Sequence, residues 1–246
     1  MSHVLITGGT GLLGEAFVKG FMSKGFDVTF TTTSQEKGES LKSTFSDDVA
    51  KKLDFRVIKF TAESNIKEFL NSERNQNYSH LINNARTLKG LKVDEYGVAN
   101  ESSLNAEFFM AVTLPYMLSI GLMSSLESIV NITSMYGVVP PNKNLYEDGY
   151  KSNPIQYGVA KAAQIHLTKE LSVRLADNNI KVNSLSLGGI EGRVDEAFQK
   201  RYASLCPSGR MLNIKEVFSP LWFLASGESN GMTGHNLIVD GGWSVW

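Results

Sequence analysis

Short apolar runs of strand length alternate along the chain with longer stretches in which apolar residues recur at helical spacing. The apolar runs predict strands at residues 4–6, 28–30, 56–58, 80–82, 129–132, 181–185 and 236–239. The segments between them predict helices at residues 12–24, 36–52, 64–76, 102–124, 156–178 and 214–225. Because strands that alternate with helices form βαβ units, the pattern predicts an α/β fold with a doubly wound parallel sheet and helices on both faces.

Composition narrows the class of protein. The 246 residues contain no low-complexity or proline-rich stretch, so they fit a single Rossmann-type domain over residues 1–246. The 24 basic and 25 acidic residues nearly balance, so no overall field recruits nucleic acid or a membrane surface. One cysteine and no signal peptide or membrane-length apolar run lead us to expect a cytoplasmic protein.

A glycine-rich turn joins the first predicted strand to the first predicted helix. Its glycines follow the G-x-G-x-x-G pattern at Gly9, Gly11 and Gly14. Glycines permit positive φ and close backbone approach, while the positive end of the helix receives a pyrophosphate. In this context the turn predicts a dinucleotide site, with a simple tight turn as the alternative. The predicted cofactor-binding residues are Thr7, Gly8, Gly9, Gly11, Leu12, Leu13 and Gly14.

The end of the second predicted strand bears on the choice of cofactor. NAD sites usually carry an acidic residue here, but this chain has Thr32, Thr33 and Ser34. Hydroxyl groups hydrogen-bond a 2′-phosphate without the repulsion of a carboxylate, and Lys37 is near in sequence. The pattern therefore favours NADP, and NAD stays open because Glu36 can serve a ribose.

Tyr157 and Lys161 lie four residues apart in a predicted helix, so they share one face. A phenol with a pKa of about 10 is a poor acid or base at neutral pH, and a fixed cation nearby lowers that pKa. The pair predicts an acid/base tyrosine, although the same spacing also occurs by chance in helices.

Taken in order, the glycine turn, Asn83-Asn84-Ala85, Ser134, Tyr157-x-x-x-Lys161 and residues 234–242 resemble the short-chain dehydrogenase/reductase family over essentially the whole chain. The resemblance implies an NAD(P)(H)-dependent oxidoreductase that moves hydride between nicotinamide and a secondary alcohol or ketone. It implies that Tyr157 is the acid/base, that Lys161 tunes it and binds the cofactor ribose, and that Ser134 orients the substrate oxygen. It also implies cofactor contacts at Asn83, Asn84, Ala85, Gly188 and Ile190.

Three positions depart from the family pattern. Arg86 replaces a glycine, Leu187 replaces a proline, and Ala111 replaces the asparagine that helps hold a water in the family's proton relay. These departures keep a second class open, a catalytically weak cofactor-binding regulatory or scaffold protein. A sugar-nucleotide epimerase is a third interpretation, disfavoured because the chain lacks the length for a separate substrate domain.

A turn-rich insertion at residues 140–154 predicts a substrate-side loop. With Tyr146 and Glu147 it resembles bacterial oxidoreductases of nonulosonic-acid and flagellin-glycan pathways, which favours a sugar-like or other polar small-molecule alcohol over an acyl chain. The histidines show no metal-ligand spacing, so no metal is expected. The apolar residues 243–246 favour a homodimer or homotetramer.

Overall fold

The computed structural model describes residues 2–147, 151–192 and 194–245. Within these ranges, seven strands form one parallel sheet in the order β3-β2-β1-β4-β5-β6-β7. The strands are β1 (His3–Ile6), β2 (Asp27–Thr32), β3 (Leu53–Val57), β4 (His80–Asn83), β5 (Ser128–Ser134), β6 (Lys181–Leu187) and β7 (Asn236–Val239). The predicted doubly wound parallel sheet is confirmed. The chain leaves β1 toward β2 on one side and returns to β4 on the other, which places a crevice at the carboxyl ends of β1 and β4.

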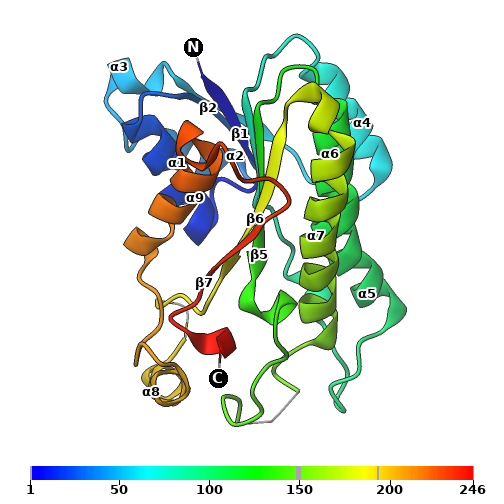
Figure 1. Cartoon of the computed structure of the whole chain (residues 1–246), viewed down its shortest axis with the longest axis vertical. Coiled ribbons are helices and arrows are strands. Elements are labelled where there is room, and N and C mark those ends of the chain that lie inside the picture. The colour runs from blue at the N-terminus through cyan, green and yellow to red at the C-terminus, as the bar shows by residue number, and fades with distance from the viewer. Residues whose placement is uncertain (1, 148–150, 193, 246) are drawn as a thin grey trace.

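Helices cover both faces of the sheet (Figure 1). The principal helices are α1 (Leu12–Ser23), α2 (Gln35–Lys42), α3 (Asp47–Ala50), α4 (Glu63–Ser72), α5 (Glu101–Phe108), α6 (Leu114–Gly121), α7 (Ile155–Arg174), α8 (Glu196–Leu205) and α9 (Phe218–Ala225). Because side chains alternate along a strand, Val4 and Ile6 pack in the core beneath α1 and α9, and Leu5 packs in the core beneath α4, α6 and α7.

Three helical segments differ from the predictions. The helix expected at residues 36–52 is divided into α2 and α3, and the one expected at residues 102–124 is interrupted between α5 and α6. Helix α8 was not predicted, because Tyr202 is its only fully buried residue and the apolar pattern is weak. Strand β3 also begins at Leu53, three residues before the predicted start at residue 56.

The interruption between α5 and α6 is the π-helix η2 (Phe109–Thr113). Pro115, at the start of α6, has no N–H, so the carbonyl of Ala111 loses its usual donor four residues ahead. A π-turn widens the backbone ladder locally and often lies at a functional site. Here it surrounds Ala111, the position of the missing family asparagine.

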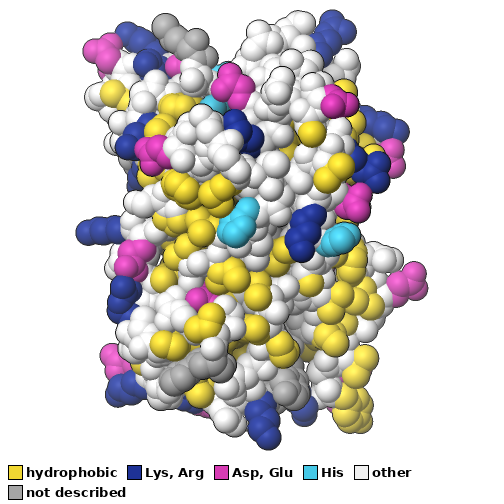
Figure 2. Space-filling model, in the orientation of Figure 1, with side chains coloured by type: hydrophobic (Ala, Val, Ile, Leu, Met, Phe, Trp, Pro, Cys, Tyr) yellow, Lys and Arg dark blue, Asp and Glu magenta, His cyan; other side chains and the backbone are white. Residues whose placement is uncertain are grey.

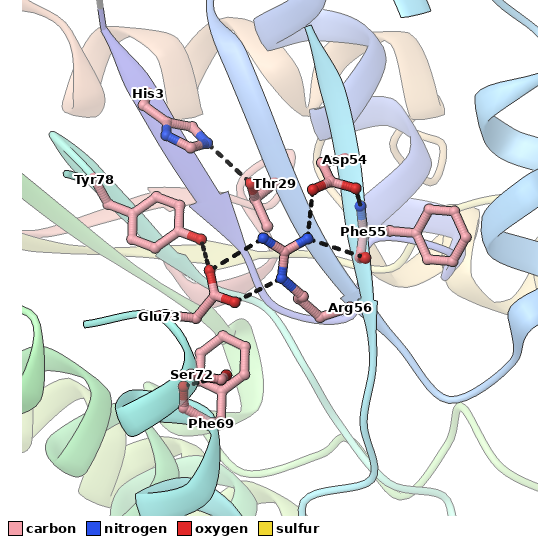
Figure 3. A network of polar contacts seen from close by, with 9 residues as sticks. All are labelled: His3, Thr29, Asp54, Phe55, Arg56, Phe69, Ser72, Glu73 and Tyr78. Carbon is pink, nitrogen blue, oxygen red and sulfur yellow. Dashed lines mark hydrogen bonds and ion pairs between the residues drawn. The ribbon is translucent and has the colours of Figure 1, made fainter. Parts of the chain in front are cut away.

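Polar side chains near the β3 edge of the sheet form a connected set, here called the edge network (Figure 3). Arg56 Nε donates to Glu73 Oε1 at 2.6 Å, and Arg56 also pairs with Asp54. The Tyr78 hydroxyl donates to Glu73, which is 2% exposed. The complete edge network consists of His3, Thr29, Asp54, Arg56, Glu73 and Tyr78. It ties β1, β2 and β3 to the segment after α4.

Hydrophobic side chains gather over α9 and β7 on the face shown in Figure 2, with charges of both signs scattered around them. No helix in the described ranges is long and apolar enough to cross a membrane. Trp243, expected at an exposed terminus, is instead buried against Tyr202, with ring centroids 4.5 Å apart. This tryptophan therefore gives no support to an oligomer. Val245 is exposed, and residue 246 lies outside the described residues.

Candidate active site

The glycine turn leaves β1 and enters α1 through backbone geometry that requires glycine. Gly8 has a φ of +71°, which side chains disfavour. A Cβ on Gly9 would lie 2.5 Å from Phe30, and one on Gly14 would collide with the Gly8 carbonyl oxygen. Gly8 therefore makes the turn, while Gly9 and Gly14 let β2 and α1 approach it closely.

Gly11 faces outward at the start of α1. A Cβ there would meet only the Gly8 carbonyl oxygen, at 3.5 Å, and the helix N-terminus has no side-chain cap. The open backbone and the first N–H groups of the helix, which include those of Leu12 and Leu13, suit the oxygens of a pyrophosphate. The turn therefore fits the phosphate portion of a dinucleotide.

Thr7, Asn84 and Ala85 form the support of this turn. The buried Thr7 hydroxyl accepts hydrogen bonds from the backbone N–H groups of Asn84 and Ala85, at 2.9 and 3.0 Å. The Asn84 amide donates to the carbonyl oxygens of Thr7 and Gly8. These bonds join the carboxyl ends of β1 and β4, so the three residues stabilise the conformation of the turn.

The three polar residues at the end of β2 differ in accessibility. The Thr32 hydroxyl is buried and hydrogen-bonds the Thr10 hydroxyl at 2.8 Å. The Ser34 hydroxyl accepts from Lys37 N and caps α2. Thr33 and the Lys37 side chain are exposed. Thr33 and Lys37 are therefore the exposed donors among these residues, and Ser34 keeps its own hydroxyl proton.

The segment after β6 borders the same crevice. Gly188 N donates to Val239 O at 2.9 Å, and Gly189 N donates to the Tyr202 hydroxyl at 3.0 Å. Ile190 is half-buried against the core beneath α1 and α9. The segment is thus fixed to β7 and α8.

Ser134, Tyr157 and Lys161 are brought together where β5 meets α7. Ser134 ends β5 and is followed by the short helix η3 (Met135–Gly137), whose Gly137 packs so closely on α7 that a Cβ there would lie 2.8 Å from the Lys161 carbonyl carbon. Tyr157 lies in the first turn of α7 and Lys161 one turn later. The Ser134 hydroxyl accepts from the backbone N–H of Tyr136, so its own proton remains available for another acceptor.

Lys161 is buried, and its ammonium group is held from two sides. Its Nζ donates to the carbonyl oxygen of Ile132 and to Gln164 Oε1, both at 2.8 Å. Two of its three donors are therefore used, and one remains. Burial first, and then Arg86, lower the pKa of Lys161 to about 8, while Glu107 acts in the opposite direction.

A chain of buried hydrogen bonds connects Lys161 to the sheet. Asn83 Nδ2 donates to Asn131 Oδ1, and Asn131 Nδ2 donates to the Thr168 hydroxyl. The Thr168 hydroxyl donates to the Gln164 carbonyl oxygen. Asn83, one of the predicted cofactor-binding residues, is 3% exposed and braces β4 against β5 through its bond to Asn131.

Two charged residues complete the site. The Arg86 guanidinium lies 5.1 Å from the centre of the Tyr157 ring, at cation–π distance. Glu107 is buried at the end of α5, one turn before Ala111, and was missed by the sequence reasoning. The available signal was a single charge within the run Ala-Glu-Phe-Phe-Met.

Among the described residues, no group of three His, Cys, Asp or Glu side chains is placed to hold a metal ion.

Residues of the insertion and of α8 line an open hollow of about 230 Å³. The Tyr136 and Tyr146 hydroxyls lie 2.8 Å apart, and Arg201 donates to Leu145 O and pairs with Glu147. The lining residues are Tyr146, Glu147, Ser152, Phe198 and Arg201. Residues 148–150 of the insertion lie outside the described residues.

Comparison with known proteins defines the class. A family model described as enoyl-(acyl carrier protein) reductase matches residues 11–244. A short-chain dehydrogenase from Leptospira borgpetersenii with bound NAD+ superposes with a TM-score of 0.86 at 27% identity, covering 99% of this chain and 93% of that one. The structure of ElxO with NADP bound gives a TM-score of 0.81 at 25% identity, covering 98% of each chain.

Curated relatives agree with that class. The NADH-dependent L-xylulose reductase of Ambrosiozyma monospora is 25% identical over 98% of this chain and 94% of its own length. The post-translational flagellin modification protein A of Campylobacter coli is 36% identical, but over only 48% of this chain and 46% of that protein. The chain belongs to the short-chain dehydrogenase/reductase family. The prediction of a nicotinamide-dependent oxidoreductase acting on alcohol or carbonyl groups is confirmed, and the scaffold alternative is not favoured.

Proposed function

We propose that the enzyme interconverts a polar, sugar-like secondary alcohol and its ketone, with Tyr157 as the acid/base. The observation that carries this proposal is the buried Lys161 ammonium, held by Ile132 O and Gln164 one helical turn after Tyr157 and beside the end of β5. The phenol and the fixed cation therefore lie on one face of α7, one turn apart.

Proton movement follows from the hydrogen bonds of the site. Bound nicotinamide supplies the hydride acceptor for oxidation and the hydride donor for reduction. In oxidation, Tyr157 Oη accepts the proton of the alcohol, and in reduction it returns that proton to the carbonyl oxygen. The Ser134 hydroxyl accepts a hydrogen bond from Tyr136 N and donates its own proton to the substrate oxygen. Lys161 keeps one donor for the cofactor ribose.

A polar substrate suits the hollow beside the site. Its lining mixes tyrosine, serine and phenylalanine with the paired charges of Glu147 and Arg201. The L-xylulose reductase relative acts, by its name, on a sugar. The test is a panel of ketoses, simple ketones and 3-oxoacyl thioesters, with NADPH or NADH consumption followed optically. We expect the ketoses to be reduced fastest. Failure to reduce any ketone by protein that binds the cofactor would overturn the proposal.

NADP is the proposed cofactor, because β2 ends without a carboxylate and is followed by the exposed Thr33 and, in the first turn of α2, the exposed Lys37. A lysine attracts a 2′-phosphate, so Lys37→Glu should weaken NADPH binding about tenfold and leave NADH binding nearly unchanged. Fluorescence titration with each cofactor measures this. Lys42→Glu, at the other end of α2, is the matched control. Equal loss for both cofactors, or tighter NADH binding by the wild type, would contradict the assignment.

A homodimer or homotetramer is also proposed. Apolar side chains on the outer face of the α5 to α7 layer, including Phe108, Tyr116 and Val159, are exposed in the single chain. Such side chains favour association of chains. Sedimentation equilibrium measures the mass, and a monomer at micromolar concentration would contradict this part of the proposal.

A further inference from the structure

Arg86 places a positive charge beside the active-site crevice that the proposed reaction does not use. The residue follows the carboxyl end of β4, and the backbone before it is fixed, because Ala85 N donates to the Thr7 hydroxyl at 3.0 Å. The Arg86 guanidinium lies over the Tyr157 ring, 5.1 Å from the ring centre. The charge therefore lies next to the proposed acid/base, which must contact the oxygen of the substrate.

The guanidinium has no carboxylate partner within the part of the chain that the structure describes. Arg56, Arg174, Arg201 and Arg210 each pair with a carboxylate, whereas no ion pair involves Arg86. Contact with an aromatic ring uses the face of a guanidinium, and its five N–H donors lie in its plane. Because the Arg86 side chain is exposed, these donors can reach a molecule bound in the crevice.

The charges around Tyr157 are predominantly positive. Lys161, one turn along α7, is the second cation, and the acidic group that acts on it is Glu107. Glu107 packs against Gly90, where a Cβ would lie 2.5 Å from Glu107 Oε1, and burial raises its pKa. Since burial disfavours its ionised form, Glu107 compensates the two cations only in part, and the crevice favours a negatively charged ligand.

The pyrophosphate of the cofactor is one negative group that the crevice receives. It fits the open backbone at Gly11 and the first N–H groups of α1. The Arg86 guanidinium instead lies over a side chain of α7. Because the two positive sites belong to different elements, Arg86 remains for a second anionic group.

We propose that Arg86 binds a negatively charged group, a carboxylate or a phosphate, of the substrate. This inference rests on the proposed function and narrows it, since the sugar-like alcohol or ketone is then an acidic or phosphorylated sugar. A guanidinium pairs with either anion through two parallel N–H···O bonds and stays charged over the physiological pH range. Such a pair orients the substrate beside Tyr157, so Arg86 is a specificity-determining residue.

The first test uses ketoses that share the carbon skeleton of fructose and differ in charge. Fructose is neutral, 2-ketogluconate and fructuronate carry a carboxylate at opposite ends, and fructose 6-phosphate carries a phosphate. We expect kcat/KM for at least one charged ketose to exceed that for fructose about 30-fold, as a charge-assisted hydrogen-bonded pair provides. The preferred ketose distinguishes carboxylate from phosphate. Equal values for fructose and all three charged ketoses would overturn the inference.

The second test removes the charge. Arg86→Gln should lower kcat/KM for the preferred ketose about 30-fold, chiefly through KM, and leave the value for fructose within about twofold. Arg86→Lys keeps the charge without the paired N–H groups and should give an intermediate value. Arg174→Gln, in the last turn of α7, is the control and should change neither value, since Arg174 pairs with Glu170. A preference for the charged ketose that survives in Arg86→Gln, or an equal loss for fructose, would overturn the inference.

A binding measurement separates this inference from the proposed function. Tyr157→Phe keeps the ring beneath Arg86 and removes the acid/base, so calorimetry of its NADP complex measures ketose binding without turnover. Adding Arg86→Gln should weaken binding of a charged ketose about 30-fold and binding of NADP less than twofold. Equal ketose binding with and without Arg86 would overturn the inference, and so would weakened NADP binding, which would assign the guanidinium to the cofactor. Absence of ketone reduction by the wild type would overturn the proposed function instead.

Discussion

Two sets of charged side chains, each with one buried carboxyl group, are built in opposite ways. In the edge network, the carboxylate of Glu73 receives hydrogen bonds from Arg56 and Tyr78, and Arg56 also pairs with Asp54. The second set, called here the active-site charge cluster, consists of Arg86, Glu107 and Lys161. These residues form no ion pair with any described residue. An ion pair holds both side chains in their charged forms, whereas a charged side chain without a direct partner can change its protonation state with pH or with a bound ligand.

The pKa shifts show the same difference. In the edge network, burial disfavours charge, but hydrogen bonds outweigh it, so the pKa of Arg56 is raised and that of Asp54 is lowered. In the charge cluster burial dominates, so the pKa of Glu107 rises and that of Lys161 falls to about 8. Hydrogen bonds in the edge network therefore favour the charged forms of Arg56 and Asp54, whereas burial disfavours the charged forms of Glu107 and Lys161.

The largest difference between the two regions is expected for Tyr157. Removing its hydroxyl in Tyr157→Phe removes the acid/base, so kcat/KM should fall about 10³-fold. The unfolding free energy should be nearly unchanged, because the ring keeps its packing against Arg86. Steady-state kinetics and urea denaturation measure the two quantities. Retained turnover in this variant would remove Tyr157 from the chemistry.

The edge network should show the reverse behaviour. Glu73→Gln leaves Arg56 without its buried partner, and breaking such a pair costs about 3 kcal/mol of unfolding free energy. Activity of the folded protein should not change, since none of the described hydrogen bonds of the edge network involves Ser134, Tyr157 or Lys161. The control is Glu63→Gln on α4, whose exposed pair with Lys67 contributes less than about 0.5 kcal/mol. Equal losses in the two variants would show that the edge network is not a stabilising element.

Lys161 extends the comparison to the pH dependence of the unfolding free energy. Its pKa is about 8 in the folded chain and about 10.4 when unfolded, so between these values the unfolded chain holds more protons. Stability should therefore rise with pH across this window. Relative to Lys161→Met, the wild type should gain about 2 kcal/mol between pH 8 and pH 10, as measured by urea denaturation. Parallel curves for the two proteins would show that Lys161 has an ordinary pKa.

The hydrogen-bond chain behind Lys161 should contribute less. Thr168→Val keeps the shape of the side chain but leaves Asn131 Nδ2 without its acceptor. An unsatisfied buried donor costs about 1 to 2 kcal/mol. Thermal unfolding measures the loss, and kcat should stay within about twofold because Lys161 retains Ile132 O and Gln164 Oε1. Wild-type stability in this variant would mean that Asn131 finds another partner.

The sequence predicted the parts of the molecule that depend on local pattern. The sheet, the glycine turn and the Tyr157 and Lys161 pair follow from periodicity and from spacing along one helix. Glu107 was missed because it packs against Gly90, a residue that is distant in sequence. The buried position of Thr32 was missed for the same reason, since its partner Thr10 is distant in sequence.

Asp54 should give the smallest effect and the opposite pH dependence from Lys161. Its pKa is lowered in the folded chain, because hydrogen bonds from Arg56 and from the Phe55 N–H outweigh the effect of burial. Its stabilising contribution is therefore present above its unfolded pKa of about 4 and is lost as pH falls through the lowered folded value. The side chain is 61% exposed, so solvent screening limits the contribution to less than about 1 kcal/mol.

The measurement for Asp54 is a set of urea denaturation curves for the wild type and Asp54→Asn from pH 7 to pH 2. The difference in stability should be constant above about pH 5 and should shrink as pH falls below about 4 and the Asp54 carboxyl group takes up its proton. A difference that persists at pH 2 would assign it to packing. A difference that grows as pH falls would mean that Arg56 does not hold the carboxylate charged, and the edge network would then lose the feature that separates it from the charge cluster.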